Sequence, residues 1–219
     1  EVIRAEQTSD ETARTVFATA QAMGKTPVLC RDSAGFIVNR LLCAAMLEAM
    51  RCEQEGLADR RDIDSFLVKP EGGMPVGLFR MADQLGLALL AEVIGILNEA
   101  FGPRFAVPVE IRERVAAGDL GVSTGRGMYD HADPAAVKPT GCEKNRDLVV
   151  SRVLTAVVAE ARRMAAEGVA SEEDIDTAMR NGALFKKPPF AYTGETGGAR
   201  AMDERIREYA QKFGGAFII

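Results

Sequence analysis

Hydrophobic residues fall on nearly every face of the segment 37–50, so the pattern predicts a buried helix there. The apolar positions are Ile37, Val38, Leu41, Leu42, Ala44, Ala45, Met46, Leu47 and Met50. Gly35 is expected to open this helix, with Asp32 or Ser33 as a candidate N-cap. The helix is expected to end near Gly56.

Two polar residues, Asn39 and Arg40, stand in the first turns of this apolar helix, where they need partners. From its spacing alone, Asn39 fits a hydrogen-bonded core or capping residue better than a functional residue.

The pattern also predicts elements on either side of this helix. Residues 1–4 and 26–30 read as strands separated by a helix that Ser9 or Asp10 caps and Gly24 closes. This βαβ piece is too small to bury itself, so we expect it to complete a sheet that lies upstream. Asp59 is expected to cap a short helix, with Asp62 as the capping-box partner of Asp59. A helical stretch is expected over 76–100 with a break near Gly86, and another short helix over 109–117.

The second half of the chain repeats the first at an offset of 112 residues. Identical residues at this offset are Arg40 and Arg152, Glu48 and Glu160, Arg51 and Arg163, Glu55 and Glu167, and Asp62-Ile-Asp64 and Asp174-Ile-Asp176. Ser171 and Asp174 repeat the cap of Asp59 and Asp62, and one deletion later Phe79 and Gly86 match Phe190 and Gly197. Each copy has a helix too apolar to stand alone, so we expect the two long helices to pack against each other.

The copies differ at Asn39, which is Ser151 in the second copy. A scaffold role is needed in both copies, whereas a chemical role is needed in only one. Arg40 and Glu48, present in both, are therefore expected to be structural, and the case for a functional Asn39 rises to even.

Composition and charge argue against several classes of protein and of site. A net charge of -5 without a basic cluster argues against nucleic acid binding. The single histidine, His131, and four cysteines without a C-x-x-C pair argue against a metal site and a disulfide framework. With no signal peptide and no run of 18 apolar residues, we expect a cytoplasmic protein without a membrane span.

In order along the chain, Glu1-Val-Ile, Gly24-Lys-Thr-Pro27, Gly35-Phe-Ile-Val-Asn-Arg-Leu-Leu42 and Glu55-Gly56 resemble the L-3-hydroxyacyl-CoA dehydrogenase family. The tandem second copy is similar to its long members, such as the α-subunit of the fatty-acid oxidation complex. The resemblance implies an upstream Rossmann domain that binds NAD and a helical region that closes over acyl-CoA.

The resemblance also implies roles for individual residues. Glu1 matches the Glu that orients a catalytic His, and Asn39 matches the Asn that holds the thioester or 3-oxygen of the substrate. Ser33 is expected to contact substrate as well. The His would precede Glu1, and no G-x-G-x-x-G fingerprint is present, so NAD is expected to be bound mainly by a domain outside this chain.

Three departures from the family pattern bear on these roles. Ala34 replaces a Pro before Gly-Phe, which affects how the helix begins. Ser123 stands where the family has a Lys that approaches the cofactor, so Ser123 is only a weak cofactor-binding candidate. Lys186 and Lys187 fit a turn with a solvated charge pair better than a CoA phosphate site.

The sequence thus predicts a mainly α protein with two tandem helical repeats related by pseudo-twofold symmetry, preceded by a βαβ remnant of a Rossmann domain. The expected domains are 1–31, 32–130 and 141–219. The expected function is the substrate-binding C-terminal region of an NAD-dependent 3-hydroxyacyl-CoA dehydrogenase of fatty-acid β-oxidation, inactive alone and part of a homo-oligomer or multienzyme assembly. The alternative is a non-catalytic helical module for dimerisation or subunit assembly.

Overall fold

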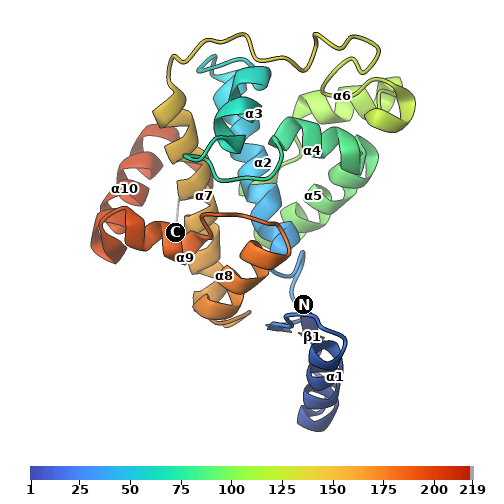
Figure 1. Ribbon diagram of the computed structural model, residues 1–219, viewed down its shortest axis with the longest axis vertical. Helices are drawn as coiled ribbons and strands as arrows, with labels where there is room; N and C mark the ends of the chain where they lie inside the picture. Colours follow the sequence, from blue (N-terminus) through green and yellow to red (C-terminus); the bar gives the residue numbers. More distant parts are fainter. Residues whose placement is uncertain (218–219) are drawn as a thin grey trace. The chain divides into compact units, whose positions relative to one another are not determined.

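The computed structural model describes residues 1–217, so the last two residues of the expected second repeat lie outside the described part. The chain is mainly helical with a two-stranded parallel sheet, which confirms the predicted fold class. In chain order (Figure 1) the elements are β1 (Val2–Arg4), α1 (Asp10–Ala22), β2 (Leu29–Arg31), α2 (Val38–Gln54), α3 (Arg60–Val68), α4 (Leu78–Leu85), α5 (Leu87–Phe101), η1 (Pro103–Phe105), α6 (Val109–Ala117), η2 (Val122–Thr124), α7 (Arg146–Ala166), α8 (Glu172–Asn181), α9 (Pro189–Glu195), α10 (Gly198–Phe213) and η3 (Gly215–Phe217).

The chain forms two compact units whose limits cut both long helices. The first unit contains residues 1–42 and the described residues from 157 onward, and the second contains residues 43–156. Each unit therefore holds one part of α2 and one part of α7. The expected domain limits at 31/32 and 130/141 follow the sequence repeats and not these compact units, and they stay a prediction.

The βαβ piece in the first unit forms as the sequence predicts. β1 and β2 pair in parallel with Ile3 opposite Cys30. The Ser9 side chain caps α1 by accepting a hydrogen bond from the amide of Thr12 at 3.1 Å. Gly24, with φ of 74°, follows the helix in the left-handed region that glycine tolerates best.

The start of α2 differs from the expectation. The helix begins at Val38, and neither Asp32 nor Ser33 caps it. Gly35 and Phe36 have φ of 72° and 47°, values that a right-handed helix excludes, so residues 34–37 form a turn instead. The cap comes from a distant residue: the Oε1 atom of Glu1 accepts hydrogen bonds from the amides of Ile37 and Val38 at 2.6 and 3.2 Å.

Reciprocal ion pairs link the two long helices. In the first unit, Arg40 of α2 donates from Nε to Glu160 Oε1 of α7 at 2.7 Å. In the second unit, Arg152 of α7 donates from Nε to Glu48 Oε1 of α2 at 2.8 Å. All four side chains are buried. The predicted contact between the long helices and the structural role of these residues are confirmed, and each copy supplies an Arg to the Glu of the other copy, as a pseudo-twofold relation requires.

The outer partners of these arginines repeat as well. Glu167 pairs with Arg40, and Glu55 pairs with Arg152. Both glutamates are partly exposed at the ends of the helices, so each arginine joins one buried and one accessible carboxylate.

The short helices after α2 and α7 begin alike. The Asp59 side chain caps α3 through the amide of Arg61 at 2.9 Å, and Ser171 caps α8 through the amide of Asp174 at 3.1 Å. The expected capping-box role of Asp62 is wrong. Its buried carboxylate instead accepts a hydrogen bond from the amide of Thr140 at 2.8 Å, because the segment that joins the two copies passes over it.

The predicted break at Gly86 is confirmed. Gly86 has φ of 92° and separates α4 from α5, which meet at an angle of 103°. Within residues 1–217, no unbroken helix combines the length and hydropathy that crossing a bilayer requires, and α4 with α5 meets the criterion only as this bent pair.

Candidate active site

The site predicted from the sequence centres on the first turn of α2, where Glu1 is held by the helix. The positive end of the helix dipole and the free amides of Ile37 and Val38 favour a carboxylate at this place. Only the Oε1 atom of Glu1 is used in these bonds. The Oε2 atom makes no hydrogen bond within residues 1–217, and the residue is exposed. Glu1 is therefore a fixed carboxylate that can accept a further hydrogen bond.

Asn39, the second residue of α2, directly follows Val38, whose amide binds this carboxylate. Its side chain is exposed and forms no hydrogen bond among the described residues, whereas its neighbour Arg40 is fully buried. Asn39 is therefore neither a core residue nor the cap of the helix, contrary to the interpretation that its spacing favoured. Its amide retains two donors and an acceptor for a ligand.

Ser33 belongs to the turn that leads into α2. It is half-buried, and its carbonyl oxygen accepts a hydrogen bond from the amide of Phe36 at 2.9 Å. Its hydroxyl has no partner in the described part of the chain. Glu1, Ser33 and Asn39 all belong to the first unit, and Glu1 and Asn39 share one helix end.

Ser123 lies in the second unit, exposed on η2. The loop that follows is anchored on the buried carboxylate of Asp83. That carboxylate accepts hydrogen bonds from the amides of Met128 and Tyr129 at 2.6 and 2.9 Å, and it lies 2.8 Å from His131 Nε2. His131 is therefore tied into the scaffold of the loop.

Close packing explains a glycine of this loop. A Cβ atom on Gly127 would lie 2.2 Å from Oδ1 of Asp83, a distance that no side chain tolerates. Glycine is therefore required where the loop crosses the anchoring carboxylate.

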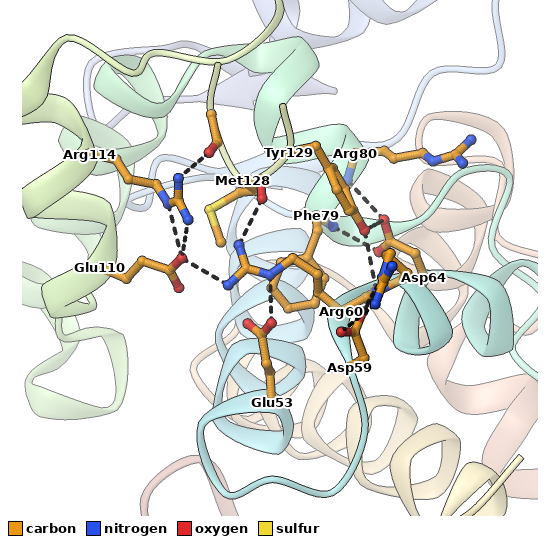
Figure 2. A network of polar contacts seen from close by, with 12 residues as sticks. Glu53, Asp59, Arg60, Asp64, Phe79, Arg80, Glu110, Arg114, Met128 and Tyr129 are labelled. Atoms are coloured by element: carbon orange, nitrogen blue, oxygen red, sulfur yellow. Dashed lines mark hydrogen bonds and ion pairs between the residues drawn. The ribbon is translucent and has the colours of Figure 1, made fainter. Parts of the chain in front are cut away.

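A second set of polar contacts fixes the same loop from α3 and α6 (Figure 2). Arg60 donates to Glu110 Oε1 and to the carbonyl oxygen of Met128, each at 2.8 Å, and it also pairs with Glu53. Arg114 binds Glu110 and the carbonyl oxygen of Gly127. The second copy has Glu172 in place of Arg60, so this network exists only in the first copy.

Asp64 completes the network. Its carboxylate accepts hydrogen bonds from the amides of Phe79 and Arg80 at 2.9 and 3.0 Å, and from the hydroxyl of Tyr129 at 2.9 Å (Figure 2). Burial raises the pKa of Asp64 to about 6, although these three donors oppose the rise.

Two features of the site were missed from the sequence. The capping of α2 by Glu1 joins residues 36 positions apart, and no local pattern signals such a contact. The role of Asp64 had a signal, because Asp176 at the same place in the second copy caps α9 through the amides of Phe190 and Ala191 at 2.8 and 2.9 Å. A residue kept in both copies indicates structure, and these two aspartates follow that rule.

The family model of the 3-hydroxyacyl-CoA dehydrogenase C-terminal domain matches residues 35–131 and again residues 148–216. A probable 3-hydroxybutyryl-CoA dehydrogenase of Deinococcus radiodurans is 39% identical over 132 residues, covering 60% of this chain and 47% of that protein. The fatty acid oxidation complex subunit alpha of Aliivibrio fischeri is 34% identical over 233 residues, covering 100% of this chain and 33% of that protein. The chain thus spans about a third to a half of the length of these relatives.

The fold is also similar to solved structures. The crystal structure of 3-hydroxybutyryl-CoA dehydrogenase from Escherichia coli K12 superimposes with a TM-score of 0.85 at 20% identity, covering 99% of this chain and 64% of that one. The (S)-3-hydroxybutyryl-CoA dehydrogenase from Ralstonia eutropha matches at 40% identity with a TM-score of 0.55, covering 58% of this chain and 45% of that one. The first likeness concerns the fold alone, whereas the second also extends to the sequence.

Proposed function

Since the chain belongs to the family of 3-hydroxyacyl-CoA dehydrogenase C-terminal domains, we propose that it is the substrate-side region of an NAD-dependent enzyme. The reaction is the oxidation of an L-3-hydroxyacyl-CoA to the 3-oxoacyl-CoA, a step of fatty-acid β-oxidation. The observation that carries the proposal is the pairing at one helix end of a fixed carboxylate, Glu1, with an exposed amide, Asn39, that has no partner in the described chain.

This pairing suits the chemistry. A hydride leaves C3 readily only while the proton of the 3-hydroxyl is being removed, and a neutral imidazole is a suitable base at physiological pH. In the proposed enzyme, the imidazole belongs to a residue outside this chain. The free Oε2 of Glu1 accepts its other N–H, which fixes the tautomer and stabilises the imidazolium. The amide of Asn39 donates to the 3-oxygen or the thioester oxygen of the substrate.

The dinucleotide does not fit the residues of this chain. The connection from β1 to α1, residues 5–9, contains no glycine and so offers no tight turn against which a pyrophosphate could pack. NAD, which accepts the hydride, is therefore assigned to a separate Rossmann domain. We place the enzyme in the cytoplasm because Cys30, Cys43 and Cys52 are buried free thiols, which are typical of a reducing compartment. We also propose a homo-oligomer or multienzyme assembly, because the relative from Aliivibrio fischeri is the alpha subunit of a complex.

The test compares the 219-residue chain alone with the same chain joined to a Rossmann domain of the family that carries the catalytic His. The chain alone should neither bind NAD tightly nor oxidise 3-hydroxybutyryl-CoA, as followed by NADH absorbance. The joined protein should turn over, and Glu1→Gln in it should lower kcat by about 10²–10⁴, because a neutral amide can still hydrogen-bond the imidazole that acts as base but cannot stabilise its positive charge.

Two outcomes contradict the proposal. Turnover by a preparation whose mass matches the chain alone would refute the division of labour between domains. A joined protein that folds and binds NAD but shows no turnover would favour the alternative, a non-catalytic module for dimerisation or subunit assembly.

A further inference from the structure

A hollow in the second unit lies between α3, the segment before α4, and the chain that joins the two copies. Its volume is about 360 Å³, and three cationic residues line it: Arg61, Lys69 and Arg80. The remaining wall is largely apolar, formed by Val68, Val76 and Val137 among others. Val68 is 47% exposed, so its side chain is available to a ligand in the hollow.

The cations keep free donors. Arg61 uses Nε and Nη2 for Asp59, and Arg80 uses Nη2 for the carbonyl oxygen of Val137 at 2.7 Å. Within residues 1–217, Nη1 of Arg61 and both Nε and Nη1 of Arg80 have no hydrogen-bond partner. Lys69 pairs with the exposed Glu143 at 2.6 Å and so retains two of its three donors.

The one carboxylate in the lining is already satisfied. Asp64 accepts its hydrogen bonds from the scaffold, and Figure 2 shows the guanidinium of Arg80 extending away from it. The carboxylates paired with Arg61 and Lys69, Asp59 and Glu143, are about half exposed and belong to pairs that a stronger anion can exchange.

The second copy supplies an internal control. The capping carboxylates Asp64 and Asp176 hold equivalent amides, so the two copies align here in space as well as in sequence. The cations are not kept: the second copy has Glu173, Asn181 and Ala191 in place of Arg61, Lys69 and Arg80. The repeat fold therefore forms without these three positive charges.

Contacts with the joining segment explain part of this difference, because Lys69 and Arg80 each give it one bond. They do not explain Arg61, which binds Asp59, two residues away at the start of the same helix.

We propose that this hollow binds a small organic phosphate, with the phosphate at Arg61, Lys69 and Arg80 and an aromatic ring against Val68, Val76 and Val137. Planar guanidinium groups match phosphate oxygens in bidentate geometry. The volume is at the small end of the range for ligand pockets, which suits a mononucleotide-sized group. A free nucleotide and the adenosine bisphosphate end of a larger cofactor share this chemistry.

Isothermal titration calorimetry of the 219-residue chain tests the proposal with pyrophosphate, AMP, adenosine 3′,5′-bisphosphate and adenosine. AMP or the bisphosphate should bind more tightly than pyrophosphate, and adenosine should not bind. A preference for the bisphosphate over AMP indicates the larger cofactor as the source. Added salt should weaken binding, because charge pairs at a surface are screened.

Variants locate the site. Arg61→Gln should weaken binding by about tenfold or more, the usual loss for a hydrogen bond to a charged group, without lowering the melting temperature, because its contacts stay within the start of α3. The double variant Lys69→Asn/Arg80→Ala, which installs the residues of the second copy, should abolish measurable binding. Arg200→Ala, which removes a 92% exposed cation from the second copy, is the matched control and should bind as wild type.

Equal binding of AMP and adenosine would overturn the role of the phosphate. The proposed site would be refuted if none of the probes bound at 1 mM, a concentration that corresponds to a binding free energy of about 4 kcal/mol. It would also be refuted if Arg61→Gln and the wild type bound with equal affinity. If circular dichroism shows that the double variant is unfolded, the affinity of Arg61→Gln alone decides whether the site exists.

Discussion

Equivalent positions on the two long helices share buried arginines and differ in the residue just before them. Arg40 and Arg152 are both fully buried, and each binds one buried and one accessible glutamate of the other copy. The residues just before them differ, Asn39 in the first copy and Ser151 in the second. Under the proposed function, duplication separates what the fold needs, which is kept twice, from what a single site needs, which is kept once.

The same separation holds further along the repeat. Asp64 and Asp176 cap the next helix in both copies, whereas Arg60 and its partners, which fix the loop after Ser123, occur only in the first. The first copy therefore carries both a candidate catalytic residue and a rigid loop. The second copy retains the packing surface.

The largest effect is expected from breaking a buried ion pair. Glu160→Gln removes the buried carboxylate that Arg40 and Arg163 share and should lower the free energy of unfolding by about 3–5 kcal/mol, because the buried Arg40 guanidinium then relies on the partly exposed Glu167 as its counter-charge. Glu48→Gln should lower it by a similar amount, since Glu48 is the equivalent partner of Arg152. Urea denaturation measures both.

Glu167→Gln is the matched control for these variants. It removes the 37% exposed partner of the same Arg40 and should change stability by about 0–1 kcal/mol. Equal losses for Glu160→Gln and Glu167→Gln would show that burial does not decide the strength of these pairs.

Substitutions at the equivalent positions Asn39 and Ser151 should differ in their effect on catalysis. In the joined dehydrogenase, Asn39→Ala should lower kcat/KM for 3-hydroxybutyryl-CoA by about 10²–10³, the usual loss of one positioned donor to a developing charge. Its melting temperature should hardly change, because the side chain is exposed and unbonded in the described chain. Ser151→Ala is the control and should leave kcat/KM within about twofold of wild type. A melting shift at Asn39 without a change in rate would favour a structural role.

The smallest effect concerns pH. The pKa of Asp64 is raised from 3.8 to about 6, so its protonated form is favoured in the folded state. Its contribution to stability is present below about pH 4 and is lost as pH rises through about 6. Relative to Asp64→Asn, the wild type should lose on the order of 2–3 kcal/mol between pH 4 and pH 7, measured by urea denaturation in a pH series.

Asp176→Asn, at the half-buried equivalent position, controls for loss of the helix cap itself. Parallel pH curves for wild type and Asp64→Asn would show that the buried carboxylate does not titrate in this range.

Much of the fold was determined by the sequence alone. The 112-residue offset predicted the two copies, the contact between α2 and α7 and the structural role of Arg40 and Glu48. These features could be predicted because a repeat is found by comparing the sequence with itself, without knowing which residues are in contact. Glycine and capping residues placed most helix ends within a few residues, since backbone conformation and the first free amides act over one turn.

The tertiary structure alone decided how the candidate site is built. Two consecutive residues with positive φ, Gly35 and Phe36, delay α2 to Val38, and the carboxylate of Glu1 replaces the expected local cap. Asn39 belongs to a helix whose other faces are buried, yet its side chain is exposed, which a pattern of apolar residues does not predict. Both facts depend on which segments meet in space, and residues far apart in the sequence leave no local signal of the contacts that they make.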